Sequence, residues 1–340
     1  MSVSQVNKIL GLPRPGDAAV SNESSPVAAP PESDFTKAFG PLLPAAQYIT
    51  TPKGKFAYFD LPPSSSTTSP TTQPSTVQRV LLVHGIQTPA LGLYPLASHL
   101  RKAFPSTHFV TFDLWGHGLS DTPRVPHAPQ LFLEQVDTLL DHLFWPSAHL
   151  VGYSLGSTIV AGYTATKTAR ADSVVYVAPA GLFSIHDFSA AEQALLRGEP
   201  MEQGGAVDEV ASRDFIIDFL EGGELVVPAD AEARIAKGEV VAEAVKDWEM
   251  KVHAGHAASV AAIVRDGNIM DREEVFEKAS ATGKPRFAVL GEHDGLSNLG
   301  KVQAVGIEEV VVVEGAGHAV VRAQAKEVCQ AIEGFWRGLD

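Results

Sequence analysis

From residue 77 onward, short apolar runs alternate with longer segments in which apolar residues recur at helical spacing. Continuous apolar runs of about four to eight residues are typical of strands buried on both faces. The pattern predicts strands over residues 79–83, 108–112, 149–152, 174–177, 287–290 and 310–313. It predicts helices over about residues 93–104, 129–143, 155–169, 271–281 and 318–338. This alternation indicates an α/β fold with a central, mostly parallel sheet and helices on both faces.

The pattern differs before residue 77. Residues 1–45 are rich in Pro, Ala and Ser and show no sustained period, so we expect a disordered N-terminal arm. A strand is predicted over residues 55–61. Residues 62–76 consist of Pro, Ser and Thr except for Gln73, a composition typical of a long solvated loop. Residues 46–182 then form the first part of the core, with this loop inside it.

The alternation stops between about residues 182 and 270. This stretch contains helical runs, including residues 213–220 and 241–264, and no convincing buried strand. An insertion between two strands of one sheet must fold on top of that sheet. We therefore predict a mainly helical cap over residues 183–270, and the second part of the core over residues 271–340.

Charge and cysteine content exclude several classes of function. The chain has 26 Lys and Arg against 40 Asp and Glu, a net charge of −14, which disfavours nucleic acid and anionic lipid as partners. The single cysteine, Cys329, cannot form an internal disulfide, and no Cys and His residues have the spacing of a zinc site. We expect no metal and no cofactor. Without a signal-like or membrane-spanning apolar segment, the sequence predicts a cytoplasmic protein without stable membrane insertion.

The strongest chemical signal is the pentapeptide Gly152-Tyr153-Ser154-Leu155-Gly156, between a predicted strand and a predicted helix. Two glycines at this spacing let the chain reverse sharply, which exposes the serine hydroxyl above the sheet. A serine is a poor nucleophile at neutral pH unless a general base lies within hydrogen-bond reach. Ser154 is therefore the candidate nucleophile, and another part of the chain must supply its base.

The candidate base is His318, because it follows the last strong strand in a glycine-rich segment. The base needs an acidic partner that fixes its tautomer. Asp294 directly follows a predicted strand and is the candidate acid, with Glu292 as its nearest competitor. The order serine, acid, histidine, each after a different strand, is the arrangement expected of one fold. We expect surface or structural roles for the histidines His142, His149, His253 and His256.

Attack by a serine also requires donors for the oxyanion that forms. One is the backbone N–H of Leu155, at the start of the helix after the nucleophile. The other is expected from the loop after residue 83, where Gly85 allows close approach and Ile86 supplies its N–H. We interpret His84 as a residue that braces this loop.

Together these segments resemble the α/β-hydrolase fold superfamily, over roughly residues 77–182 and from residue 285 to the C-terminus. The resemblance is carried by His84-Gly85, Asp113-Leu114-Trp115-Gly116-His117-Gly118-Leu119-Ser120-Asp121, the serine pentapeptide, Gly291-Glu292-His293-Asp294 and Gly315-Ala316-Gly317-His318. It implies Ser154 as nucleophile, Asp294 as acid and His318 as base. It also implies a structured turn near the pocket, in which we expect a scaffolding role for Asp113, His117 and Ser120.

The leading hypothesis is a serine hydrolase of carboxylesterase type. It would cleave an ester, thioester or related acyl bond of a small, partly hydrophobic substrate through an acyl-enzyme. The same triad serves C–C bond hydrolases, lactonases and perhydrolases, and a non-catalytic small-molecule receptor or carrier is the alternative from another class. The candidate residues of an apolar pocket between cap and core are Gln87, Phe183, Phe215 and Phe219.

Overall fold

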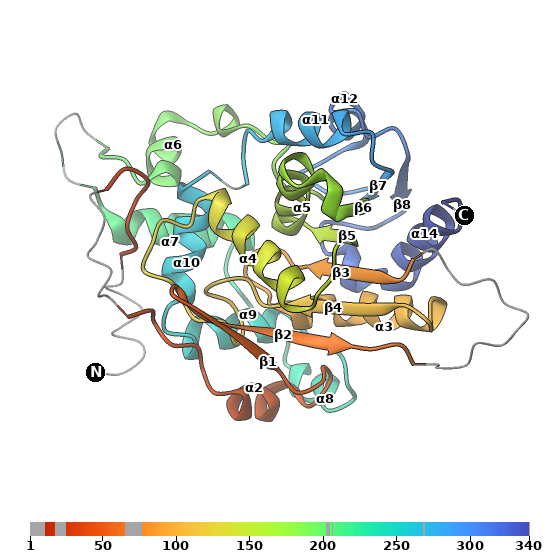
Figure 1. Ribbon diagram of the computed structural model, residues 1–340. Helices are drawn as coiled ribbons and strands as arrows, with labels where there is room; N and C mark the ends of the chain where they lie inside the picture. Colours follow the sequence, from red (N-terminus) through yellow and green to blue (C-terminus); the bar gives the residue numbers. More distant parts are fainter. Residues whose placement is uncertain are drawn as a thin grey trace, which may run out of the picture.

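The computed structural model describes residues 11–17, 25–64, 77–201, 205, 207–267 and 269–339. At its centre is an eight-stranded sheet with the order β1-β2-β4-β3-β5-β6-β7-β8 (Figure 1). The strands are β1 (Gln47–Thr51), β2 (Gly54–Leu61), β3 (Arg79–Val83), β4 (His108–Phe112), β5 (Ala148–Tyr153), β6 (Ala171–Val177), β7 (Arg286–Gly291) and β8 (Val310–Val313). β2 pairs antiparallel with both β1 and β4, and the other pairs are parallel. The predicted α/β fold with a mostly parallel sheet is confirmed.

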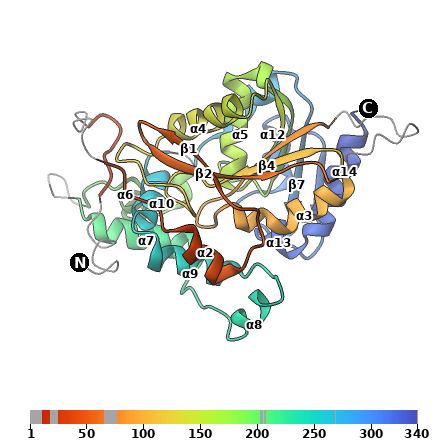
Figure 2. The ribbon, with the colours of Figure 1, turned by 60° about the horizontal axis from the view of Figure 1, so that its bottom comes forward.

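Helices cover both faces of the sheet (Figures 1 and 2). One face carries α4 (Pro129–His142), α5 (Leu155–Thr166) and α11 (Glu273–Ala281), and the other carries α3 (Tyr94–Ala103) and α14 (Ala325–Arg337). Side chains alternate between the two faces along each strand. In β3, Leu81 and Val83 therefore join the apolar cluster on the face of α4, α5 and α11, and Val80 and Leu82 join the cluster on the face of α3 and α14. Because both faces are buried, the strands read as continuous apolar runs in the sequence.

Two predicted helices are each divided in the structure. The run at the C-terminus forms α13 (Val320–Ala323) and α14, which are separated at Gln324. The run over residues 241–264 forms α9 (Ala242–Val252) and α10 (His256–Arg265), with a break at residues 253–255. The remaining helical elements are η1 (Ala90–Leu93), η2 (Thr168–Arg170), η3 (Ile185–Asp187), α6 (Ala190–Arg197), α7 (Glu209–Glu221), α8 (Ala231–Ile235) and α12 (Leu299–Ala304).

The segment between β6 and β7, for which we keep the name cap, contains α6 to α10 and no strand among its described residues. In Figure 1, α6, α7 and α10 gather at one side of the sheet, and α8 lies apart from them. Ile216 of α7 and Val260 and Ile263 of α10 are fully buried and join the apolar cluster of the core. The cap therefore packs directly on the sheet domain.

The expectation of a disordered arm is wrong for the described part of residues 1–45. Residues 32–39 form the helix α2 (Glu32–Phe39), which lies beside α9 (Figure 2). Phe35 and Phe39 are buried, and their ring centroids lie 5.4 and 5.7 Å from that of Trp248. Phe35 and Phe39 are four positions apart, so one face of a short helix buries both rings. Tertiary burial thus stabilises a segment whose composition predicted disorder.

Other expectations for the N-terminal part fall outside the described residues. These are the arm over residues 1–10 and 18–24, and the loop over residues 65–76. The strand β1 pairs with β2 and was absent from the sequence interpretation. Within the described part of the chain, no helix is both long enough and apolar enough to span a membrane.

Candidate active site

Ser154 lies in the sharp turn between β5 and α5. Its φ of 52° and ψ of −119° are strained for a residue with a side chain. A Cβ atom on Gly156 would lie 2.1 Å from the carbonyl oxygen of Val83, and one on Gly152 would lie 2.4 Å from that of Gly156. Only glycine fits at either position. The two glycines therefore allow the close packing of strand, turn and helix that holds Ser154.

The three predicted triad residues lie within hydrogen-bond distance of one another. His318 Nε2 is 3.0 Å from Ser154 Oγ, and His318 Nδ1 is 3.0 Å from Asp294 Oδ2. The Asp294 side chain is fully buried, whereas that of His318 is 32% exposed. Nδ1 can therefore donate its proton to the carboxylate, while Nε2 faces the serine and can accept one.

Neighbouring groups orient both members of this pair. Asp294 Oδ1 accepts a hydrogen bond of 2.9 Å from the N–H of Leu296, and Tyr153 donates through its hydroxyl to the backbone oxygen of His318 over 3.2 Å. The competing acid, Glu292, instead accepts a hydrogen bond of 2.8 Å from the N–H of Gly315, in the loop before His318. Glu292 thus braces the loop of the base, and Asp294 is the carboxylate in contact with its ring.

The two predicted oxyanion donors lie beside Ser154. Leu155 is the first residue of α5, and Ile86 follows Gly85 in the loop after β3. A Cβ atom on Gly85 would lie 3.0 Å from Ser154 Cβ, so this loop runs directly against the serine. Among the described residues, neither the N–H of Ile86 nor that of Leu155 donates to another protein group. Their role as oxyanion donors stays a prediction.

The predicted pocket residues lie where the cap meets the core. The ring centroids of Phe183 and Phe219 are 6.2 Å apart, and Phe215 packs against the same apolar cluster. Gln87 is buried, and its side chain donates a hydrogen bond of 2.7 Å to Glu221 at the end of α7. Its amide therefore contacts the cap. A role of these four residues in substrate binding stays a prediction.

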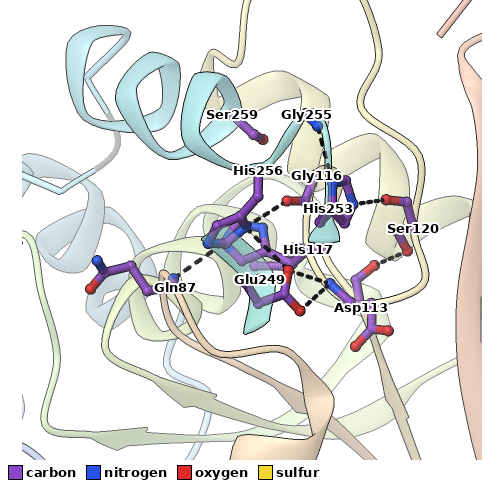
Figure 3. Close-up of polar contacts among 12 residues, drawn as sticks. Gln87, Asp113, Gly116, His117, Ser120, Glu249, His253, Gly255, His256 and Ser259 are labelled. Atoms are coloured by element: carbon purple, nitrogen blue, oxygen red, sulfur yellow. Dashed lines mark hydrogen bonds and ion pairs between the residues drawn. The ribbon is translucent and has the colours of Figure 1, made fainter. Parts of the chain in front are cut away.

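The predicted scaffolding residues form a buried polar cluster under the cap (Figure 3). Asp113 accepts hydrogen bonds of 2.8 Å from the N–H groups of Ala90 and Leu119, and burial raises its pKa to about 7. Ser120 donates through its hydroxyl to the Asp113 backbone oxygen over 2.6 Å. His117 Nε2 accepts the N–H of Gln87 over 3.2 Å. These residues connect the turn over residues 113–121 to the loop after β3.

The histidines expected to be structural also contact backbone or neighbouring side chains. His84 accepts the Leu114 N–H over 2.8 Å and lies 2.6 Å from the Gly85 backbone oxygen, so it braces the loop. Burial lowers its pKa to about 4. The polar contacts of the others include Tyr58 for His142, Ser173 for His149 and the Ser120 backbone oxygen for His253. His256 Nδ1 contacts the Gly116 backbone oxygen and lies 3.3 Å from Oε2 of the buried Glu249.

Two cap carboxyls in contact with these segments were missed by the sequence interpretation. Glu249 of α9 is fully buried and accepts a hydrogen bond of 2.9 Å from the N–H of Gly118, and Glu221 contacts Gln87. Each lies in a helical run with many acidic residues, so nothing local distinguishes it. In the described part of the chain, no group of three or more His, Cys, Asp or Glu side chains is arranged to bind a metal ion.

Comparisons with known sequences point to one fold family. Residues 78–208 match the family model described as alpha/beta hydrolase fold. The chain is 27% identical over 125 residues to the (E)-2-((N-methylformamido)methylene)succinate hydrolase of Acinetobacter baylyi. This alignment covers 37% of this chain and 45% of that protein. It is 29% identical over 130 residues to the human (lyso)-N-acylphosphatidylethanolamine lipase, with 36% and 37% covered. The match spans less than half the length of either relative.

Solved structures extend the likeness over most of the chain. A carboxylesterase structure from Nitrososphaera gargenis has a TM-score of 0.61 at 17% identity and covers 86% of this chain and 98% of its own. The enol-lactonase of Burkholderia xenovorans has a TM-score of 0.59 at 16% identity, with 86% and 100% covered. At these identities the likeness is one of fold. Together with the sheet order and the family match over residues 78–208, it shows that the chain has the α/β-hydrolase fold.

Proposed function

We propose that this protein is a serine hydrolase that cleaves an ester, thioester or related acyl bond of a small, partly hydrophobic substrate. The observation that carries the proposal is the hydrogen-bonded series from Ser154 through His318 to the buried Asp294. The serine lies in a strained turn at the carboxyl end of a strand, and the imidazole is partly exposed. Such a series serves nucleophilic attack by an otherwise unreactive hydroxyl.

The mechanism follows from the roles of these atoms. Ser154 Oγ attacks the acyl carbon as His318 Nε2 takes its proton, and Asp294 stabilises the imidazolium. The N–H groups of Ile86 and Leu155 bind the oxyanion. His318 then protonates the departing alcohol or thiol, which leaves an acyl ester on Ser154. Water, deprotonated by His318, attacks this ester and releases the carboxylic acid and the free serine.

Two further observations support an acyl bond and a partly apolar substrate. The curated relatives are named as a hydrolase and a lipase. The aromatic side chains of the cap, Phe183, Phe215 and Phe219, pack in the apolar cluster at the junction with the core. Movement of the cap relative to the core would expose these rings to an acyl or alkyl group.

The test is reaction of the intact protein with a fluorophosphonate, followed by peptide mapping. We expect the adduct on Ser154, none in Ser154→Ala, and normal labelling in the control variant Ser157→Ala, whose hydroxyl is buried and donates to the Gly152 backbone oxygen over 2.7 Å. Turnover of p-nitrophenyl esters should rise from acetyl to medium-chain acyl groups. An unlabelled wild type, with ester turnover retained in Ser154→Ala, overturns the proposal.

A further inference from the structure

Gln87 has a strained backbone directly after the proposed oxyanion donor Ile86. Its φ is 66°, in the left-handed region that residues with a side chain rarely adopt, and it is only 3% exposed. Such a conformation persists when the surrounding structure holds it. Because Ile86 and Gln87 share a peptide unit, the contacts that fix Gln87 also constrain the backbone of Ile86.

Two hydrogen bonds hold Gln87, one on the backbone and one on the side chain. The backbone N–H donates to His117 Nε2 over 3.2 Å, as Figure 3 shows. The side-chain amide donates to Glu221 Oε1 over 2.7 Å. His117 belongs to the core turn, whereas Glu221 is the last residue of α7 in the cap. The strained residue is therefore fixed from the core and from the cap.

The position of Glu221 is unfavourable for a helix by itself. A carboxylate at the C-terminus of a helix faces the negative end of the helix dipole. The Glu221 side chain is only 6% exposed, and its second oxygen, Oε2, lies 2.8 Å from Nζ of Lys246 in α9. Both carboxylate oxygens are thus engaged, one by the cap lysine and one by Gln87. Both partners lie outside α7, the helix that carries Glu221.

The helix α9 supports both attachments of Gln87. Lys246 contacts Glu221, and Glu249, three residues further on, accepts the N–H of Gly118 beside His117. Residues three apart lie on the same side of a helix. One side of α9 therefore connects to the side-chain contact and to the turn that makes the backbone contact.

We propose that Glu221 is a positioning residue: through the Gln87 side chain it fixes the loop after β3, so that the Ile86 N–H points at the oxyanion formed on Ser154. This inference rests on the proposed function, because it presumes an oxyanion at that place. It goes further by assigning part of the oxyanion site to the cap. The oxyanion site would then be complete only when α7 of the cap is packed against the core.

The test exchanges the two partners. Gln87→Glu places two buried carboxylates face to face, so we expect kcat to fall about 30-fold with KM within about threefold, less than the loss of a whole oxyanion donor. The double variant Gln87→Glu/Glu221→Gln restores one amide–carboxylate bond and leaves an amide oxygen for Lys246. We expect it to recover kcat to within about fivefold of wild type.

A second measurement separates positioning from general damage. An arylboronic acid forms a tetrahedral adduct with a reactive serine, which places an oxygen in the oxyanion site. Its inhibition constant should rise in Gln87→Glu in parallel with the loss of kcat and recover in the double variant. The control is Glu239→Ala, which removes an exposed cap ion pair with Arg234 and should change neither quantity.

Two results overturn the inference while the proposed function stands. One is a double variant as slow as Gln87→Glu although urea unfolding shows both folded and the fluorophosphonate still labels Ser154. The other is a Gln87→Glu variant that raises KM with kcat unchanged, which would make Gln87 a substrate contact. A wild-type protein that does not react with the fluorophosphonate overturns the proposed function, and this inference with it.

Discussion

The candidate triad and the buried cluster under the cap are built from the same residue types. Each places histidine rings within hydrogen-bond distance of carboxyl groups or backbone. In the triad, the side chain of His318 is 32% exposed and Nε2 faces a hydroxyl. In the cluster, His84, His117 and His256 are completely buried and contact backbone atoms.

His318 and the buried histidines differ in the hydrogen-bond partner of the second ring nitrogen. His84 and His117 each accept a backbone N–H, and a ring nitrogen that accepts such a bond cannot also carry a proton. Burial and the neighbouring His256 lower the pKa of His117 well below its usual range. These rings stay neutral and connect chain segments. Residue type and distance therefore do not define a reactive histidine; access and the partner of the free nitrogen do.

The largest expected effect separates the two regions directly. His318→Ala should lower kcat at least about 10⁴-fold, because it removes the proposed base, while the free energy of unfolding changes by less than about 1 kcal/mol. His256→Ala should do the reverse, with about 2 to 3 kcal/mol of lost stability and kcat of the folded fraction within about threefold. Ester turnover and urea unfolding of both variants measure this. Equal losses of activity in the two variants would contradict the comparison.

The second effect concerns the acid. Asp294→Asn should lower kcat about 10³- to 10⁴-fold, because an amide N–H facing Nδ1 favours the tautomer that cannot accept the serine proton. Glu292→Gln is the matched control: its amide oxygen can still accept the Gly315 N–H, so kcat should stay within about twofold. Steady-state turnover of one ester by both variants decides the assignment. A larger loss in Glu292→Gln would make Glu292 the acid.

The third effect probes the buried carboxyl of the cluster. Burial raises the pKa of Glu249 well above its usual range, which favours the protonated, neutral carboxyl. Glu249→Gln should then cost less than about 1 kcal/mol. Glu249→Ala leaves the Gly118 N–H without an acceptor and opens a cavity, at a cost of about 2 to 4 kcal/mol. Urea unfolding at pH 7 measures both, and a Gln variant as unstable as the Ala variant would show that Glu249 is ionised.

The smallest effect is the pH dependence of stability. Burial lowers the pKa of His84 to about 4 and of His256 to about 3. In the unfolded chain these rings bind protons below about pH 6.5, so the stability from neutral histidine is present above that pH and is lost as the pH falls toward 4. Asp113, with its pKa raised to about 7, acts oppositely, because its protonated form stabilises at low pH. Glu249 acts in the same direction as Asp113.

The cluster contains more buried histidines (His84, His117 and His256) than buried carboxyls (Asp113 and Glu249). The effect of the histidines therefore exceeds that of the carboxyls, and we expect a lower free energy of unfolding at pH 5 than at pH 7. His256→Asn removes one titrating ring and should reduce this difference by about 2 kcal/mol. His186→Gln, at an exposed position, should leave it unchanged. Urea unfolding of the three proteins at both pH values measures the effect. The same pH dependence in His256→Asn as in wild type would mean that this ring is not held neutral.

The order of most core strands and helices could be predicted from the sequence, and so could the three candidate triad residues, because their signals are local. A strand buried on both faces is a continuous apolar run, and the turn at Ser154 needs glycine at two fixed positions. Asp294 and His318 each follow such a run directly. Every one of these features is contained in about ten consecutive residues.

The rest depends on packing between distant segments. The helix α2 is stable because Phe35 and Phe39 meet Trp248, and no period within residues 25–45 indicates that partner. Glu221 lies 134 residues from Gln87, and Glu249 lies 131 residues from Gly118. A buried carboxyl and a solvated one look alike in a helical run. Sequence therefore determined most elements of the core and the candidate reactive groups, whereas only tertiary structure decided which polar groups lose water, because that depends on the segments that cover them.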